Sequence, residues 1–277
     1  MSRLILAVIL VLTGTGEALA EEQADWREDP LGNRFLIGIG LYSPTLHTVV
    51  RSDSSNGIIG TEINFESTMG MDDNDQLPLV LGYYRFAKKH RLKFQYFRLN
   101  RIGDSISDAP IRFGDIVFPA NFPLSSYFDV DVYSLGYSYS LIHDEKKELA
   151  FSFGLQFQDI EMGISGNAGP GLIREESDVF VPLPTFGGSF DYAISEKWVF
   201  TSLIGVFGVD IDLGDDSEFA GEIVQINAGI AYKAFKNVAI GLQYNYFRVD
   251  VDVADSNWLG ALEYEYRGPV LAFGIFF

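Results

Sequence analysis

The sequence predicts an all-β protein, a closed antiparallel transmembrane β-barrel of about ten strands. Apolar residues recur at every second position through most of the chain, which is the period of a strand with one dry face. Short turns that contain lysine alternate with longer segments rich in Gly and Asp. Beyond the N-terminus, no apolar run approaches the ~18 residues that indicate a membrane helix. Together these features favour a barrel over a helical membrane protein.

The first twenty residues have the composition of a secretory signal peptide. Arg3 supplies a positive start, Leu4 to Leu12 form an apolar core, and Ala18-Leu19-Ala20 fits an A-x-A cleavage site. This stretch is too short to span a bilayer. We therefore expect Sec-type export with removal of residues 1–20, a polar periplasmic lead-in over 21–33, and the barrel over 34–277.

The bulk composition narrows the class further. The chain carries a formal charge of −18, has no cysteine, is 14% aromatic and contains 28 glycines. The acidic balance argues against nucleic acid as a partner, because phosphate recognition depends on Lys and Arg. An exported chain without cysteine needs a source of stability other than disulfides, and a closed barrel in lipid provides one.

The predicted strands are the segments that lie between the short turns and the longer loops. The short turns are AKKHR (87–91), HDEKKE (143–148), SEKW (195–198) and AFKN (234–237). The longer segments are 52–57, 103–125, 165–178, 214–222 and 254–257. Short turns at one end and long loops at the other are typical of bacterial outer-membrane barrels, which have an even strand count. The ten predicted strands are 34–50, 76–87, 90–103, 124–142, 147–163, 178–194, 197–212, 219–234, 237–253 and 258–277. The count becomes eight or twelve if 57–75 or 103–124 is misread.

The two faces of the predicted strands differ in a way that favours a membrane. In 124–142, Tyr133, Leu135 and Tyr137 alternate with small polar residues such as Ser134 and Gly136. The non-apolar face holds Gly, Ser, Asn and Gln, with few of the Lys and Glu that coat a soluble sheet. We interpret this face as a lumen and the apolar face, with Tyr and Phe at both ends, as the lipid-facing wall.

The chain ends in VLAFGIFF, with Phe277 last and Phe273 and Ile275 on alternate positions. This end resembles the terminal strand of bacterial outer-membrane barrels, and the resemblance implies an assembly signal at Phe277 that the barrel assembly machinery reads. FESTMGMDD, LGYYRFAKKHRLKFQYFRL and IRFGDIVFPANFPLSSYFDVDVYSLGYSYSL resemble a group of uncharacterised proteobacterial outer-membrane barrel proteins. The chain also resembles small barrels of the OmpA and OmpW type. No catalytic motif comes with this resemblance.

Five strands carry a pair of acidic residues two positions apart, towards the long loops. The ten residues are Asp129, Asp131, Asp159, Glu161, Asp210, Asp212, Asp250, Asp252, Glu263 and Glu265. Counted from the membrane band, four of the pairs share the outward parity; strand 197–212 is ambiguous because both of its faces are apolar. Three interpretations stay open. The strands simply become polar outside the membrane; or the carboxylates form a collar that binds lipopolysaccharide through Ca²⁺ or Mg²⁺; or a β-bulge, for which 267–269 is a candidate, turns them into the mouth of a channel.

Arg85, Lys93 and Asp191 fall on the lumen parity near the short turns. They form either a charge network that fills a narrow barrel or a polar constriction in a pore. A barrel of about ten strands is only slightly wider than the eight-stranded kind, which side chains just fill. A wide diffusion porin is therefore not expected.

Signs of catalysis are weak. His47 is the one histidine near the outer end, and Ser43 lies ~13 Å away along the strand, too far to hydrogen-bond. Asp72, Asp73 and Asp75 lack the spacing of a calcium loop. We expect a narrow channel for ions or small solutes. The alternative is a structural or adhesive surface barrel that binds lipid and lipopolysaccharide through divalent cations; an envelope enzyme comes last. No cofactor is expected, apart from Ca²⁺ or Mg²⁺ if the collar holds them.

Overall fold

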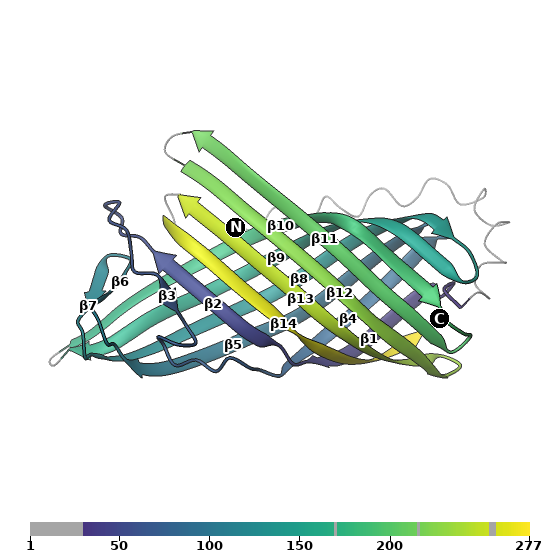
Figure 1. The fold of residues 1–277 in the computed structure, drawn as a ribbon, viewed down its shortest axis with the longest axis horizontal. Helices are drawn as coiled ribbons and strands as arrows, with labels where there is room; N and C mark the ends of the chain where they lie inside the picture. The colour runs from purple at the N-terminus through teal and green to yellow at the C-terminus, as the bar shows by residue number, and fades with distance from the viewer. Residues whose placement is uncertain (1–29, 169–170, 215–216, 255–258) are drawn as a thin grey trace, which may run out of the picture.

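The structure, a computed structural model, describes residues 30–168, 171–214, 217–254 and 259–277. Ten antiparallel strands form a ring that the pairing of the first and last strands closes (Figure 1). They are β1 (Phe35–Tyr42), β4 (Leu77–Ala87), β5 (His90–Ile106), β8 (Pro123–His143), β9 (Lys147–Ala168), β10 (Gly171–Ala193), β11 (Trp198–Gly214), β12 (Ser217–Phe235), β13 (Val238–Ala254) and β14 (Leu259–Phe276). The predicted ten-stranded barrel is confirmed. The described part of the chain holds no helix long and apolar enough to cross a membrane.

The first predicted strand is present but interrupted. β1 ends at Tyr42 and β2 (Thr45–Ser52) begins three residues later. Both pair with β14 in one register, because Tyr42 lies opposite Val270 and Thr45 opposite Arg267. Pro44 accounts for the break, since proline lacks the N–H that a ladder needs. β14 also pairs without a shift with β13 through this region, so the bulge expected at 267–269 is absent.

The two ends of the barrel differ, as expected. The turn end holds residues 88–89, 144–146, 194–197 and 236–237 and the C-terminus; the loop end holds the other connections.

Two of the loops predicted at the loop end are wrong. Residues 165–178 and 214–222 belong mostly to long hairpin strands, because β9 runs to Ala168 and β12 begins at Ser217. Bacterial barrels turn their short connections to the periplasm.

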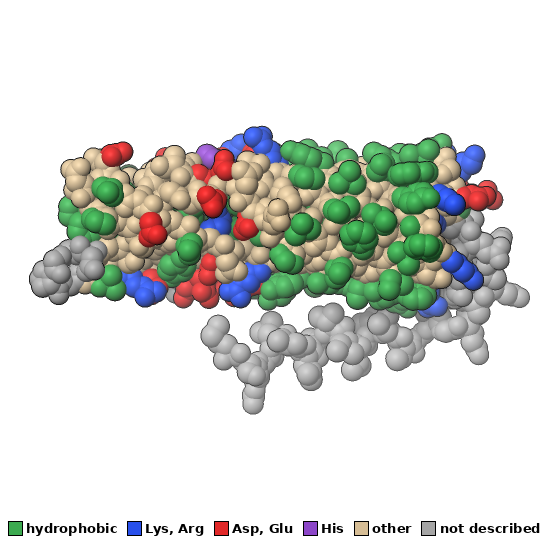
Figure 2. All heavy atoms as spheres, turned by 90° about the horizontal axis from the view of Figure 1, so that it is seen from below, with side chains coloured by type: hydrophobic (Ala, Val, Ile, Leu, Met, Phe, Trp, Pro, Cys, Tyr) green, Lys and Arg blue, Asp and Glu red, His purple; other side chains and the backbone are tan. Residues whose placement is uncertain are grey.

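The polarity of the wall inverts along single strands, and this divides the barrel into two halves. Near the turn end the outward side chains are apolar, as in Leu135 of β8, which is 57% exposed. Figure 2 shows this belt in green around one half, and acidic and basic side chains on the other. In the loop-end half the same strand turns Asp129 and Asp131 outward while Val130 and Val132 are buried inside. The same alternate positions face outward along the whole strand. What changes is the environment, because the outer wall passes from lipid to water and the lumen passes from a polar cavity to an apolar core.

The loop-end half therefore encloses an apolar core. Its buried side chains come from the ring strands, from residues 63–71 and from two small strands described below. They include Leu79, Phe97, Phe128, Ile160, Met162, Ile223, Phe247, Val249, Leu262 and Tyr266. Each fully buried aliphatic or aromatic side chain stabilises the fold by about 1.5–3 kcal/mol. This half resembles a soluble barrel standing on a membrane-embedded one.

Residues 60–75 complete the wall between β2 and β5. β3 (Ile63–Asn64) pairs with β2, and Asn74 bridges to Thr45. On the other side the Met69 carbonyl oxygen lies so close to Gly103 of β5 that there is no room for a Cβ atom at that position. The segment does not cross the membrane, so it leaves the strand count unchanged.

A small hairpin covers the loop end. It is formed by β6 (Ile111–Phe113) and β7 (Ile116–Phe118), and Phe113 and Phe118 are fully buried. Its turn contains Gly114, whose φ of 58° favours glycine and whose N–H donates to Ser52 O. We call residues 107–122 the lid.

One seam in the wall remains unpaired. The β10–β11 ladder ends at Phe186 and Val206, among the described residues, although both strands continue towards the loop end. Pro182 and Pro184 of β10 suit an edge, because proline cannot donate to a ladder. The Phe207 ring lies 6.2 Å from that of Phe186 and also packs against the apolar core, so it fills the start of this seam.

Candidate functional site

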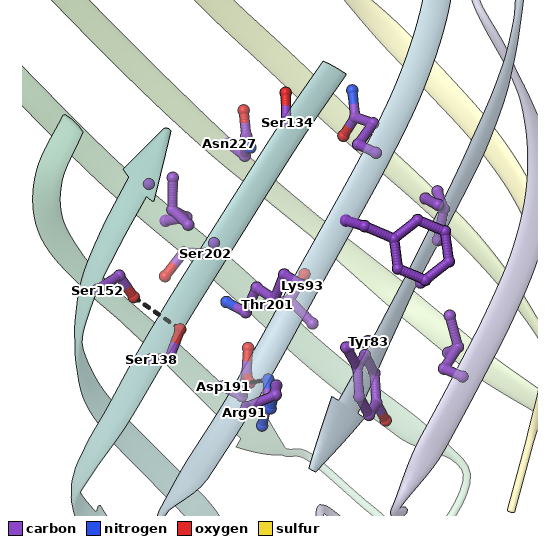
Figure 3. A pocket seen from close by; sticks show the side chains of 18 of the residues that line it. Tyr83, Arg91, Lys93, Ser134, Ser138, Ser152, Asp191, Thr201, Ser202 and Asn227 are labelled. Atoms are coloured by element: carbon purple, nitrogen blue, oxygen red, sulfur yellow. Dashed lines mark hydrogen bonds and ion pairs between the residues drawn. The ribbon is translucent and has the colours of Figure 1, made fainter. Parts of the chain in front are cut away.

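A cavity of about 340 Å³ lies inside the membrane half of the barrel (Figure 3). Small polar side chains cover much of its wall; those labelled in the figure include Ser134, Ser138, Ser152, Thr201 and Asn227. Their position follows from strand parity, since each lies opposite the apolar outer face of the same strand. The cavity is a polar space inside the barrel that a small ligand could occupy.

A charged network forms the floor of this cavity. Glu148 of β9 accepts hydrogen bonds from Arg85 of β4, at 2.6 Å, and from Arg91 of β5. Arg91 Nη1 also donates to Asp191 Oδ2 of β10 at 2.9 Å. His143 Nδ1 lies 3.4 Å from Glu148 Oε2. The network thus links five consecutive strands of the ring, two guanidinium groups facing two carboxylates.

A short segment, residues 30–33, lies with the floor at the turn end of the cavity, and we call it the strap. Residues 30–33 precede β1, yet Leu31 packs against Ala193 of β10 and Val199 of β11, which are several strands away around the ring. Lys233 Nζ of β12 donates to the Pro30 carbonyl oxygen at 2.7 Å. These contacts place the end of the predicted lead-in against the cavity, whose wall includes Pro30 and Leu31.

Glutamines and aromatic rings close the cavity above. Gln156 Nε2 donates to Gln225 Oε1 at 3.3 Å, across the lumen from β9 to β12. Towards the loop end, Phe247 and Tyr266 stack with ring centroids 4.7 Å apart at 11°, and Tyr42 meets Tyr266 edge-on. The lumen therefore changes from a polar cavity to a dry core within a few residues.

The predicted lumen charges lie inside the barrel. Arg85 and Asp191 are buried in the floor, and Lys93 lines the cavity. Arg91 and Glu148, the two other central members of the floor, were missed by the sequence analysis. Their signal was available, because Arg91 shares the parity of Lys93 and Glu148 shares that of Ser152.

The acidic collar lies on the outer wall of the loop-end half. All of the predicted residues except Asp212 have described side chains, and each of these is exposed or half-buried. Arginines on the same wall pair with some of them: Arg248 lies 2.9 Å from Glu263, and Arg267 lies 3.4 Å from Glu265. Arg98–Asp131 and Arg51–Asp252 are longer, at 3.7 Å each. The side chain of Asp212 lies outside the described residues.

The densest part of the collar lies on β8 and β9. Asp129 is directly opposite Glu161, and Asp131 is directly opposite Asp159. Like charges in this position destabilise a sheet. Among the described residues, no three His, Cys, Asp or Glu side chains come together as a ready-made metal site. A cation there would need ligands from outside the chain.

The remaining candidates lie apart from both regions. His47 points outward from β2, 3.3 Å from Asn64 Nδ2, and Glu265 is its partner across the β2–β14 ladder. Phe277, the expected assembly signal, accepts backbone hydrogen bonds from Arg34 and Phe35 and exposes its ring at the turn end.

The closed ring of ten strands and its apolar outer face define the class of protein. The chain is an integral outer-membrane β-barrel protein. A solved structure of the outer-membrane protease OmpT from Escherichia coli aligns with a TM-score of 0.56 and 9% identity, over 88% of this chain and 97% of that one. At this identity the likeness shows the fold alone.

Other solved structures align with lower TM-scores. The attachment invasion locus protein Ail of Yersinia pestis aligns at 0.34 with 10% identity, over 86% of this chain and 99% of that one. Neisserial surface protein A aligns at 0.31 with 12% identity, over 88% and 97%. No family model and no curated protein matches the chain.

Proposed function

We propose that this protein is a surface barrel that does not conduct at rest and whose loop-end half contacts lipopolysaccharide through divalent cations. The observation that carries the proposal is the inversion of polarity along single strands. In β8, Leu135 suits lipid and Asp131 suits water, and about four residues separate the two. The membrane half serves as the anchor, and the loop-end half stands in the sugar and phosphate layer.

The filled lumen supports a resting state without conduction. A solute entering from the loop end would meet the lid, with Phe113 and Phe118 buried, and then the apolar core. From the turn end it would meet the strap and the floor. Native cores are close-packed and contain few voids larger than a water molecule. A permanent water-filled path is therefore not expected.

The collar supports contact with lipopolysaccharide. Asp129, Asp131, Asp159 and Glu161 form a four-carboxylate patch on two neighbouring strands, and on β8 this patch lies four positions from the exposed Leu135. Lipid phosphates are also anionic, so a direct contact would be repulsive. Ca²⁺ and Mg²⁺ prefer oxygen ligands and can take some from the protein and others from phosphate or water. Bridging by these cations would relieve both repulsions.

Binding to lipopolysaccharide with and without divalent cations tests this function. The refolded protein is mixed with lipopolysaccharide in Mg²⁺ or in EDTA, and co-migration is measured. We expect binding in Mg²⁺ that the double change Asp159→Asn and Glu161→Gln weakens several-fold. Glu145→Gln with Glu196→Gln removes the same charge at the turn end and should leave binding unchanged. Equal binding by both double variants, or binding indifferent to EDTA, contradicts the proposal.

A narrow channel is the second candidate, and the polar cavity is the observation that favours it. Conduction would require the strap, the floor and the core to part together. A gated channel predicts discrete current steps under some condition, whereas the surface barrel predicts none.

An envelope enzyme is the third candidate. His47 is its one histidine candidate at the loop end, and it lies on the outer wall beside Asn64 and Glu265. If the protein hydrolyses lipid or peptide through this residue, His47→Ala abolishes the activity. An unchanged rate in that variant excludes the residue.

A further inference from the structure

The cavity in the membrane half has a charge balance opposite to that of the chain. Among the described residues that line it, the charged side chains are Arg91, Lys93, Lys233 and Asp191. The Asp191 carboxylate already forms an ion pair with Arg91. Lys93 and Lys233 have no carboxylate within ion-pair distance among the described residues, since the ammonium of Lys233 meets a carbonyl oxygen and the Phe276 ring. A protein of formal charge −18 thus encloses a cavity lined by excess positive charge.

We propose that this cavity binds a small organic anion, a carboxylate or a sulfonate, which enters from the turn end. Two ammonium groups on different strands, Lys93 on β5 and Lys233 on β12, provide the charge. The volume of about 340 Å³ falls at the lower end of the range for small-molecule sites. This inference does not depend on the collar or on lipopolysaccharide.

The polar wall fits the same ligand class. Ser134 and Asn227 line the cavity with hydrogen-bonding groups, as do Thr201 and Lys93, and all four are labelled in Figure 3. Leu81 and Phe94 add apolar surface. A few charged or polar groups within a partly apolar wall are the usual composition of sites for small organic molecules.

The route follows from what closes each end. Towards the loop end the cavity meets the glutamines and the apolar core, which would strip an anion of its water. Towards the turn end it meets the floor and residues 30–33, and the latter are held by the packing of Leu31 and by the hydrogen bond from Lys233 to Pro30. Lys233 lines the cavity and also donates a hydrogen bond to the Pro30 carbonyl oxygen of the strap. A bound anion would therefore compete with that carbonyl oxygen for the Lys233 ammonium group.

Charged thiol reagents can test the proposal, because the chain has no cysteine. Ser134→Cys places one thiol on the cavity wall, and Ser195→Cys places one on the exposed turn between β10 and β11. Each folded variant is treated with the anionic sulfonatoethyl or the cationic trimethylammonioethyl methanethiosulfonate. Relative to Ser195→Cys, we expect the anionic reagent to modify Ser134→Cys roughly tenfold faster than the cationic one, the low end of what a focused field gives.

Two further measurements separate binding from mere access. Lys93→Gln in the Ser134→Cys background should remove most of the preference, and Lys233→Gln does the same if the first variant fails to fold. Phosphate, sulfate and acetate serve as probes, and at least one should slow the modification saturably, whereas choline should not. Equal rates for the two reagents, a cationic preference, no reaction with either, or no protection by any anion overturns the proposal.

Discussion

Arg101 of β5, which is buried, and Glu66, which is mostly buried, form an ion pair at 2.7 Å, and this pair fastens residues 60–75 into the wall. The same guanidinium donates to Asp72 O at 2.8 Å and to Thr48 Oγ1 at 2.9 Å. Glu66 in turn accepts the backbone N–H of Thr48. One arginine therefore joins β5, β2 and the segment between them, and among the described residues no ladder pairs this segment with β5.

Removal of this arginine should loosen the segment. Arg101→Met leaves the Glu66 carboxylate buried without its partner, and breaking a buried pair costs about 3–5 kcal/mol. We expect hydrogen exchange and proteolysis within 60–75 to accelerate strongly. Arg98→Met is the matched control, since Arg98 lies on the same strand in an exposed pair with Asp131, worth about 0–1 kcal/mol. Equal effects of both changes contradict this role.

The floor should depend on its carboxylate. Glu148→Gln leaves two buried guanidinium groups facing one remaining carboxylate, and the expected loss in the free energy of unfolding is about 3–5 kcal/mol. Glu145→Gln, in the exposed turn three residues earlier, should change it by less than about 0.5 kcal/mol. Denaturant unfolding in lipid or detergent measures both. Similar midpoints for the two variants show that the network is not structural.

Because polarity is inverted in the loop-end half, substitutions at two neighbouring positions of β8 should have opposite effects on folding. Val130→Asp buries an unpaired carboxylate in the apolar core and should cost more than about 4 kcal/mol or prevent folding. Asp129→Val changes the outward neighbour and should be nearly neutral to folding. The folded yield and the unfolding midpoint report on both. Tolerance of Val130→Asp means that the loop-end half is not a dry core.

Acid should loosen the lid where it meets residues 54–55. The backbone N–H and the hydroxyl of Ser55 donate to Asp115 Oδ1 at 2.9 and 3.0 Å. Chiefly the Ser55 N–H, and then the Ser54 and Ser55 hydroxyls, hold the pKa of Asp115 below its ordinary value of 3.8, and Arg112 acts in the same direction. Glu175 lies beside the adjoining Gly114.

The direction of the pH effect follows from this shift. Because the folded pKa is depressed, the stabilisation is present above pH 3.8 and is lost as pH falls through the folded pKa. The Ser55 amide chemical shift should titrate below pH 3.8, and Asp115→Asn should abolish that titration. Titration at or above the ordinary value contradicts the contact.

The strand order, the ring and the outward side of several strands could be predicted from the sequence, whereas strand 197–212 stayed ambiguous because both of its faces are apolar. Period-2 alternation assigns a residue such as Asp250 to one face, and the register between neighbouring strands preserves that face along the whole strand. Two predicted loops became hairpins, because sequences such as 165–178 and 214–222 are rich in turn residues and yet pair across a two-strand ribbon.

The content of the lumen could not be predicted from the same pattern. Alternation tells which residues face inward, because Val249 and Val251 alternate with Asp250 and Asp252, which the sequence analysis places on the outward parity. It does not tell whether water, lipid or protein lies inside. That depends on residues 60–75 and the lid, whose Phe65 and Phe113 are fully buried, the first in a turn and the second in the short strand β6. The floor was half predicted, since Arg85 and Asp191 were named and their partners Arg91 and Glu148 were not.

Single-channel recording of the refolded protein without residues 1–20, in a planar bilayer under a salt gradient, tests the central claim most directly. The surface barrel with its filled loop-end half predicts a silent bilayer from protein that is shown to be folded. Discrete, reproducible current steps that change with Asp250→Asn and Asp252→Asn would show instead that the lumen opens and that the collar lies at the mouth of a channel.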